Sequence, residues 1–183
     1  MTRVRPIPGA SAGRARGRGD RVKADACKPV TVSRRIGAPA VEIFQILADP
    51  GRHRDIDGSG TLREAAHSAV ISGVGDVFVM RMHDPRIGEF EMNNHVVEYE
   101  PDRRIGWEPE NGRGHPGAGE PDGGRWRRWS FELTPDGPDA TVVTEIYDCS
   151  RAPEDARAEL DCGSVFLPAM TKTLERLGTL CAA

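Results

Sequence analysis

The sequence predicts an α+β domain in which an antiparallel sheet of about seven strands wraps a long C-terminal helix. From residue 61 to about 148 the chain consists almost entirely of strand-like segments separated by turns. A helix over about 165–180 then follows, and it carries a continuous apolar stripe. The sheet is the only apolar surface large enough to cover that stripe, so the two are expected to pack together.

The clearest strand signal is a hairpin over residues 125–150, with a turn at Pro135-Asp-Gly-Pro-Asp139. Side chains alternate along both strands, so each strand has one face toward the core. Arg127, Trp129, Phe131 and Leu133 share one parity on the first strand. On the second strand, polar Glu145 and Tyr147 share a parity with apolar Val143, which suggests the face toward the core. An apolar face with a few polar groups set into it is typical of a cavity wall.

Length and composition indicate one globular domain. The chain has 183 residues, 38% of them hydrophobic and 29% charged, which suits a single domain with a substantial core. No apolar run approaches the roughly 20 residues that span a bilayer, and the N-terminus has no apolar signal segment. We therefore expect no membrane insertion, a cytoplasmic location, and a monomer or a homodimer.

Residues 1–28 are expected to form a disordered Arg/Gly-rich extension, with the folded domain over 29–183. The extension holds eight Lys/Arg and two Asp, a net charge of +6, whereas the whole chain carries −3. It has too few large apolar side chains to offset the entropy of ordering. The remaining body, at −9, is too acidic to favour nucleic acid, so such binding would require the extension.

Four cysteines, Cys27, Cys149, Cys162 and Cys181, show no C-x-x-C spacing. We expect all four to be reduced thiols. Cys162 and Cys181, in or beside the C-terminal helix, could act as small core residues.

The first elements are a strand over 30–36 and a helix that Pro39 opens and Asp49-Pro50-Gly51 ends. The apolar stripe of this helix is predicted to comprise Val41, Ile43, Phe44, Leu47 and Ala48. A short helical turn or loop follows at 52–60. Its Asp-rich spacing resembles a calcium loop, but position 12 would be Ala66, so calcium is rejected.

Strands are then predicted over 61–71, 76–83, 86–100 and 103–108. Residues 111–124 are so rich in Gly and Pro that neither strand nor helix is expected there. Such a loop is either a lid over a binding site or a tolerated surface insertion. In the C-terminal helix, the stripe includes Leu167, Met170, Leu174 and Leu177.

Three phrases resemble the SRPBCC superfamily, which includes START domains, birch-pollen-allergen-like proteins and polyketide cyclases. They are Ile36-Gly-Ala-Pro-Ala-Val-Glu-Ile-Phe44 with Leu47-Ala-Asp49, then 96–107, and Ser130-Phe-Glu-Leu-Thr-Pro135 with 141–144. The segments 57–60 and 147–150 resemble the bacterial polyketide cyclase/dehydrase-like branch. The resemblance implies a helix-grip fold with a deep cavity between a curved sheet and the C-terminal helix. It implies no residue-by-residue catalytic assignment.

Strand and helix parity predicts the residues that line this cavity. They are Phe78, Met80, Met82, Phe90, Met92, Asn94, Trp107, Trp129 and Phe131, with Glu145, Tyr147, Met170 and Leu174. Each of these side chains could instead fill a solid core. The buried polar members need partners, so they either bond one another or meet a ligand.

Glu145 and Tyr147 form the candidate catalytic pair, because they point the same way about 7 Å apart along one strand. A carboxylate in an apolar pocket has a raised pKa and can act as a base, with the phenol as proton donor. A purely structural pair remains the alternative.

No metal and no cofactor are expected. His53, His67, His83, His95 and His115 are scattered without H-x-x-x-H spacing, and there is no phosphate loop, dinucleotide fingerprint or nucleophile elbow. The function expected is therefore binding of a hydrophobic small molecule, lipid or polyketide-like. The alternative is a cofactor-independent polyketide cyclase or dehydratase that uses Glu145 and Tyr147.

Overall fold

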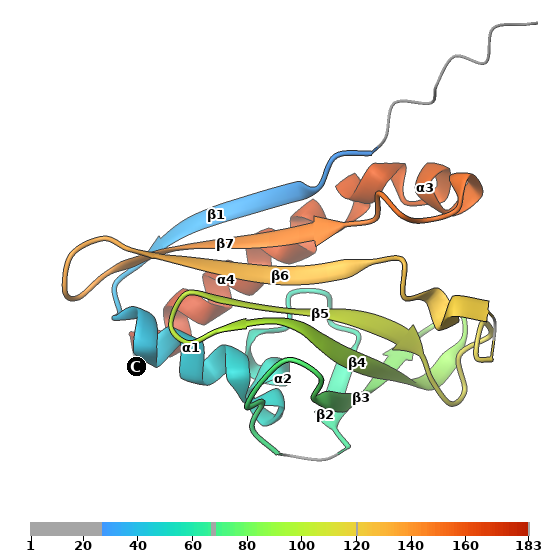
Figure 1. The fold of residues 1–183 in the computed structure, drawn as a ribbon, viewed down its shortest axis with the longest axis horizontal. Coiled ribbons are helices and arrows are strands. Elements are labelled where there is room, and N and C mark those ends of the chain that lie inside the picture. The colour runs from blue at the N-terminus through green and yellow to red at the C-terminus, as the bar shows by residue number, and fades with distance from the viewer. Residues whose placement is uncertain (1–26, 67–68, 120, 183) are drawn as a thin grey trace, which may run out of the picture.

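The computed structural model describes residues 27–66, 69–119 and 121–182. Seven antiparallel strands form one curved sheet in the order β1-β7-β6-β5-β4-β3-β2 (Figure 1). The strands are β1 Val30–Ile36, β2 Leu62–Ala65, β3 Val77–Asp84, β4 Gly88–Glu100, β5 Arg104–Asn111, β6 Arg128–Pro135 and β7 Thr141–Asp148. The expected α+β fold class is confirmed.

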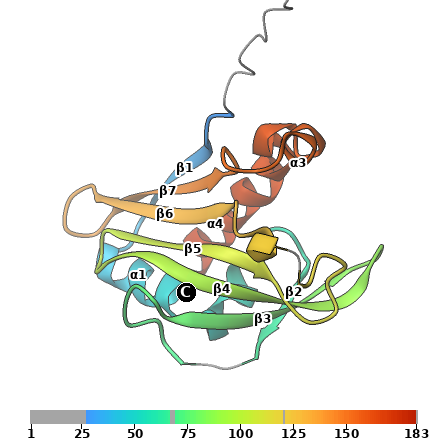
Figure 2. The same ribbon diagram turned by 45° about the vertical axis from the view of Figure 1, so that its right-hand side comes forward.

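The helices lie at the two ends of the chain and cover one face of the sheet (Figures 1 and 2). They are α1 Ala40–Ala48, α2 His53–Ile56, α3 Glu154–Glu159 and α4 Leu167–Cys181, with 3-10 turns η1 Pro50–Arg52, η2 Pro121–Gly124 and η3 Asp161–Phe166. The C-terminal end of α4 lies beside α1 (Figure 1). Within the described residues, no helix combines the length and the apolar content needed to cross a bilayer.

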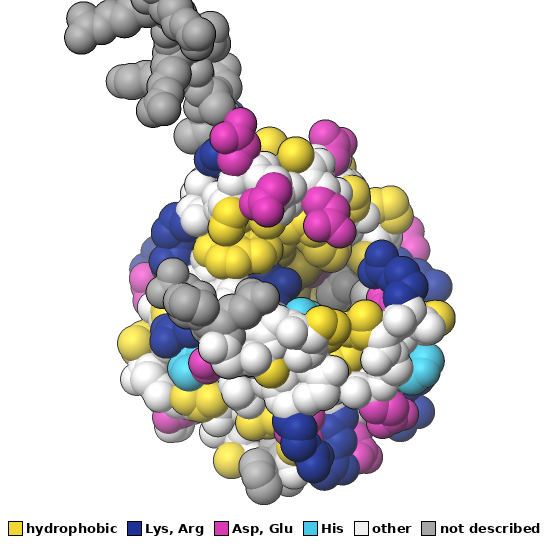
Figure 3. All heavy atoms as spheres, turned by 90° about the vertical axis from the view of Figure 1, so that its right-hand side faces the viewer, with side chains coloured by type: hydrophobic (Ala, Val, Ile, Leu, Met, Phe, Trp, Pro, Cys, Tyr) yellow, Lys and Arg dark blue, Asp and Glu magenta, His cyan; other side chains and the backbone are white. Residues whose placement is uncertain are grey.

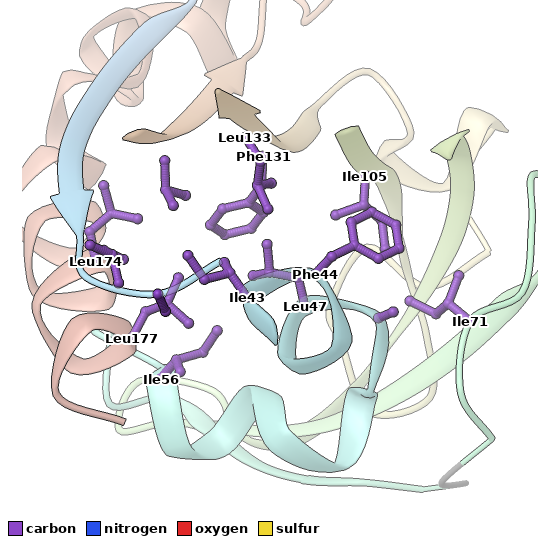
Figure 4. Close-up of a cluster of buried hydrophobic side chains, with 14 of the residues drawn as sticks. Ile43, Phe44, Leu47, Ile56, Ile71, Ile105, Phe131, Leu133, Leu174 and Leu177 are labelled. Carbon is purple, nitrogen blue, oxygen red and sulfur yellow. The ribbon is translucent and has the colours of Figure 1, made fainter. Parts of the chain in front are cut away.

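The main core occupies the end of the sheet that α1 covers, and a smaller buried cluster around Tyr147 and Met170 lies toward the other end. At the α1 end, Ile43 and Leu47 of α1 meet Leu174 and Leu177 of α4, and all four side chains are fully buried (Figure 4). Ile105 of β5 and Leu133 and Val143 of the β6–β7 pair close this cluster. The residues that belong to the main core on each strand therefore lie toward its α1 end.

Details of three expected elements differ. The strand predicted over 61–71 is limited to β2, and its residues 67–68 lie outside the described part. Val41 is 45% exposed and does not belong to the apolar stripe of α1. Residues 111–124 were expected to form neither strand nor helix, but Asn111 ends β5 and η2 forms a 3-10 turn within them.

The thiol prediction is wrong for two cysteines. Cys27 and Cys162 form a disulfide across 135 residues, with their Cα atoms 5.3 Å apart. Cys27 is itself buried. Residues 1–26 of the expected extension lie outside the described part. Cys149 and Cys181 are free thiols, as expected.

The outer face of the sheet carries a network of ion pairs. Glu108 accepts hydrogen bonds from Arg128 and Arg151 at 2.8 and 2.5 Å and lies 3.6 Å from Arg125. Burial opposes ionisation of Glu108, yet the bonds from Arg128 and Arg151 hold its pKa below the ordinary value. The arginines of this face are thus matched by carboxylates.

Gly58, which follows α2, provides a test of the packing between this part of the chain and α4. A Cβ at Gly58 would lie 2.6 Å from the backbone nitrogen of Thr173 and closer still to the carbonyl oxygen of Ala169. Because both atoms belong to the backbone of α4, they cannot move aside easily, and we expect Gly58→Ala to lower the free energy of unfolding by about 1–3 kcal/mol. Urea denaturation followed by circular dichroism measures it.

The matched control is Gly73→Ala, since nothing lies within 4 Å of a Cβ at that glycine. Its unfolding free energy should stay within about 0.5 kcal/mol of wild type. Equal effects of the two substitutions would contradict the close contact between Gly58 and α4.

Candidate functional site

A cavity of about 400 Å³ lies between the sheet and the N-terminal half of α4. It occupies the end of the sheet that α1 does not reach, with Met170 and Thr173 of α4 on one wall and β3 to β7 on the other. His53 and Ile56 of α2 also line it. Figure 3 shows the hollow on this face, with hydrophobic side chains gathered around it.

The structure places twelve of the thirteen predicted lining residues around this cavity. They are Phe78, Met80, Met82, Phe90, Met92, Asn94, Trp107, Trp129, Phe131, Glu145, Tyr147 and Met170. Leu174 is the exception, because it lies one turn further along α4 and packs into the solid core (Figure 4). Side-chain parity placed the predicted strand residues on the cavity face correctly. Helical periodicity does not say where along α4 the packed core ends and the cavity begins.

Glu145 and Tyr147 face the cavity from β7 and do not bond each other. Both side chains are almost completely buried. Glu145 Oε2 and the Tyr147 hydroxyl have no hydrogen-bond partner among the described residues. The sequence left two possibilities for the buried polar groups, that they bond one another or that they meet a ligand. The first possibility is wrong for these two atoms.

Burial controls the ionisation of this pair. It raises the pKa of Glu145 to about 8, helped by the negative charge of Asp57, so the carboxyl is mostly protonated at neutral pH. Burial also raises the pKa of Tyr147, which keeps the phenol neutral. Two uncharged hydroxyl donors consequently face the cavity from one strand.

Asn94, the third buried polar residue, does have partners. Its Nδ2 donates to the carbonyl oxygens of Met92 at 3.2 Å and Phe78 at 3.4 Å. These bonds bridge β3 and β4, so Asn94 has a structural role within the cavity wall.

Arg127 lines the cavity as well, and sequence reasoning did not include it. It directly precedes β6 and has the same parity as Trp129 and Phe131. The signal was present in the alternation, but a charged residue at the end of an apolar row was not counted as part of the wall. Its Nε is buried and has no hydrogen-bond partner in the part of the chain that the structure describes.

Three aromatic rings enclose the end of the cavity beside Arg127. The ring centroid of Tyr147 lies 4.5 Å from that of Trp129 and 4.6 Å from that of Phe166 in η3. η3 can approach this closely because Gly163 is a glycine with φ of +97°, and a Cβ there would lie 2.7 Å from the Tyr147 ring. This contact holds the Tyr147 ring in place.

A second aromatic group, around His53, encloses the opposite side. The His53 ring stacks on Trp107 and meets Phe78 edge-on, with centroids 5.3 and 5.4 Å apart. Burial lowers the pKa of His53, so the ring is neutral, and its Nε2 lies 2.8 Å from the carbonyl oxygen of Leu47. Nε2 must therefore carry the proton and donate it in that bond.

The long loop contributes to the cavity wall through His115. The His115 ring meets Phe90 edge-on at 5.3 Å, and its Nδ1 accepts a hydrogen bond from the Gly117 nitrogen at 3.0 Å. Arg86 and Ile87, in the turn between β3 and β4, lie at the rim and are exposed. Among the described residues, no three His, Cys, Asp or Glu side chains gather as they would around a metal ion.

No family model matches the chain. It is 35% identical over 122 residues to the uncharacterized protein Rv0088 of Mycobacterium tuberculosis strain H37Rv. It is 34% identical over the same length to the uncharacterized protein MT0096 of strain CDC 1551. These matches cover 66% of this chain and 48% of each relative, so the chain spans about half the length of the curated relatives it matches.

Solved structures share the fold. Protein Ms6760 of Mycobacterium smegmatis superimposes with a TM-score of 0.61 at 14% identity, over 86% of this chain and 92% of that protein. CV1439 of Chromobacterium violaceum gives 0.59 at 15% identity, over 85% and 99%. DynU16, from the dynemicin biosynthetic locus, gives 0.52 at 18%, over 85% of this chain and 47% of its own. At these identities the likeness establishes the architecture, which agrees with a helix-grip fold.

The buried carboxyl of Glu145 should leave a signature in the pH dependence of stability. Its pKa is about 8 in the folded protein and about 4.5 when exposed, so the native state holds the proton more tightly. The free energy of unfolding should therefore fall as pH rises from about 4.5 toward 8, by roughly 1.4 kcal/mol for each unit of pKa difference. Glu145→Gln cannot ionise, so it should remove this decline in chemical denaturation measured across that range.

Glu89→Gln, an exposed position on β4, is the matched control and should retain the wild-type slope. Identical slopes for wild type and Glu145→Gln would show that Glu145 is ionised and solvated in the folded protein.

Proposed function

We propose that this protein binds a largely apolar small molecule, lipid or polyketide-like, inside the cavity. The observation that carries the proposal is the combination of an apolar hollow with buried polar atoms that lack partners. A solid core would leave no volume, and a purely structural cavity would have its polar groups satisfied. A guest with an apolar body and one polar end would fill the hollow and bond to the buried polar atoms.

The size and lining of the cavity support this interpretation. About 400 Å³ falls within the range of small-molecule sites, which are mostly apolar with a few fixed polar groups. Three methionines, Met80, Met82 and Met92, supply a polarizable wall that can adapt to the shape of a guest. The rigid aromatic groups stand on either side of this methionine surface.

The resemblance to the SRPBCC superfamily, in its polyketide cyclase/dehydrase-like branch, points the same way. Proteins of that superfamily use such a cavity for lipids, sterols, hormones or polyketides. The neighbour DynU16 comes from a biosynthetic locus, which suits a polyketide-like guest better than a structural role. We place the binding step in the cytoplasm, with no cofactor.

A second candidate function is a cofactor-independent cyclase or dehydratase. It is favoured by Glu145, whose pKa of about 8 brings proton transfer close to neutral pH. The ionised carboxylate would remove a proton next to a substrate carbonyl, and the Tyr147 hydroxyl would donate a hydrogen bond to the resulting enolate oxygen. Both groups face the same hollow from one strand.

Filling the cavity should abolish ligand uptake without unfolding the protein. Met82 is half-buried on the cavity face of β3, so Met82→Trp would occupy volume that a guest needs. We expect the fluorescence gain of Nile red, a neutral apolar dye, to fall at least tenfold in this variant. Fluorescence titration at constant protein concentration measures it.

Val77→Trp is the control, because Val77 lies on the opposite face of the same strand and is 51% exposed. It should retain wild-type dye binding. If wild type takes up no dye, and native mass spectrometry with organic extraction recovers no apolar guest, the binding proposal is wrong.

The catalytic alternative predicts exchange of carbon-bound protons. A medium-chain β-keto thioester in D₂O should lose the protons between its two carbonyls faster with the protein present, as followed by NMR. Glu145→Gln should reduce the protein-dependent rate by about a hundredfold or more, while Glu89→Gln leaves it unchanged. Exchange that is unaffected by Glu145→Gln would remove this residue from the chemistry.

A further inference from the structure

The charged side chains around the cavity are not all held in ion pairs. At the rim, Arg86 pairs with Asp84 at 3.1 Å. Asp57 accepts hydrogen bonds at 2.9 Å from the backbone nitrogens of Ser59 and Gly60, so its charge is stabilised by its own loop. Arg127 remains, and no carboxylate of the described residues lies within ion-pair distance of it.

The neighbouring arginines show how this protein normally treats such charges. Arg125, Arg128 and Arg151 all converge on Glu108 at the outer face. Arg127 lies directly before Arg128 and two residues after Arg125, but its side chain lines the cavity on the inner face, away from Glu108. It is therefore separated from its neighbours' counter-ion by the sheet itself.

Arg127 is held firmly in this position. One terminal nitrogen, Nη2, donates to Asn111 Oδ1 at 2.5 Å, and its Cζ lies 5.2 Å from the Trp126 ring centroid. Both partners are neutral. A guanidinium keeps its charge even when buried, and a buried charge without a counter-ion is costly. An anion that enters the cavity would remove this cost.

Hydrogen-bond donors converge on the same end of the cavity. Trp129 lies opposite Tyr147 in the β6–β7 register, and Arg127 is two residues before Trp129 on the same face. Arg127 and Tyr147 are therefore diagonal neighbours on adjacent strands. Glu145 lies two residues before Tyr147 on β7, opposite Phe131 and one inward position further from Arg127. Burial keeps its carboxyl protonated at neutral pH, so it too presents a donor to the cavity.

We propose that the guest of the cavity is a monocarboxylic acid, bound as the carboxylate with its head group between Arg127 and the Tyr147 hydroxyl and its apolar body along the methionine wall. The inference rests on the proposed binding function and specifies its ligand class. A carboxylate has oxygen acceptors for the Arg127 Nε and for both hydroxyl donors. A single negative charge also matches the single unpaired cation, whereas a phosphate dianion would leave a net negative charge in the same apolar space.

The first test compares acids with their neutral methyl esters on wild-type protein. Decanoate and methyl decanoate provide an aliphatic pair, and 2-naphthoate and its methyl ester an aromatic pair, in displacement of Nile red at pH 7. We expect at least one acid to bind tenfold or more tightly than its ester. The pair with the larger preference distinguishes a fatty-acid source from an aromatic, polyketide-like one.

The second test removes the cation. Arg127→Gln should abolish the preference of acid over ester while ester affinity changes by less than about threefold. Arg86→Gln is the matched control, since Arg86 also lines the cavity but is exposed and already paired with Asp84. It should retain the wild-type preference.

A third measurement uses the wild-type protein alone. The ¹³C resonance of carboxyl-labelled decanoate, titrated in complex with wild type, reports the pKa of the bound acid. Contact with Arg127 should lower that pKa below the value in water, whereas an apolar site without a cation would raise it. A raised pKa overturns the inference.

The outcomes separate the two proposals. If wild type binds acids and esters equally, or if Arg127→Gln keeps the preference, the carboxylate assignment is wrong and apolar binding stands. If neither dye, acid nor ester binds, the binding function itself fails.

Discussion

The structure depends on an incomplete filling of the curved sheet. The sheet is concave along its whole length, but α1 covers only one end of it. At that end Ile43 and Leu47 meet Leu174 and Leu177 to form a dry core (Figure 4). Toward the other end, α4, η3 and the short α2 segment face the strands, and their side chains fill the space only in part. The cavity is the volume that remains.

Single helices and strands contribute residues both to the core and to the cavity wall. On α4, Leu174 and Leu177 belong to the core, whereas Met170 and Thr173 face the cavity. On β7, Val143 belongs to the core while Glu145 and Tyr147 face the cavity. One end of each element therefore provides stability through apolar burial, and the other end is available for a guest. The buried carboxyl of Glu145 lies on the cavity end of β7, where a partner from outside can reach it.

The outer face of the sheet explains why Arg127 is unusual. Glu108 collects the arginines that point outward, so that their charges are neutralised within the protein. Arg127 lines the cavity on the inner face, where neutral Asn111 and Trp126 fix its position without matching its charge. The arginines of this group that point outward thus share a carboxylate, whereas Arg127 on the inner face has none among the described residues and can pair with an anion that enters the cavity.

The sequence by itself determined the element order, the inward parity of the strands and most of the strand residues in the cavity wall, because alternation and helical periodicity are local properties. Only the tertiary structure decided that Cys27 reaches Cys162, that Leu174 is core, and that His53 and His115 join the wall. It also decided that Glu145 and Tyr147 remain unpaired. These facts depend on which segments meet in space and on where the packed volume ends, and neither quantity is encoded in the spacing of residues along one element.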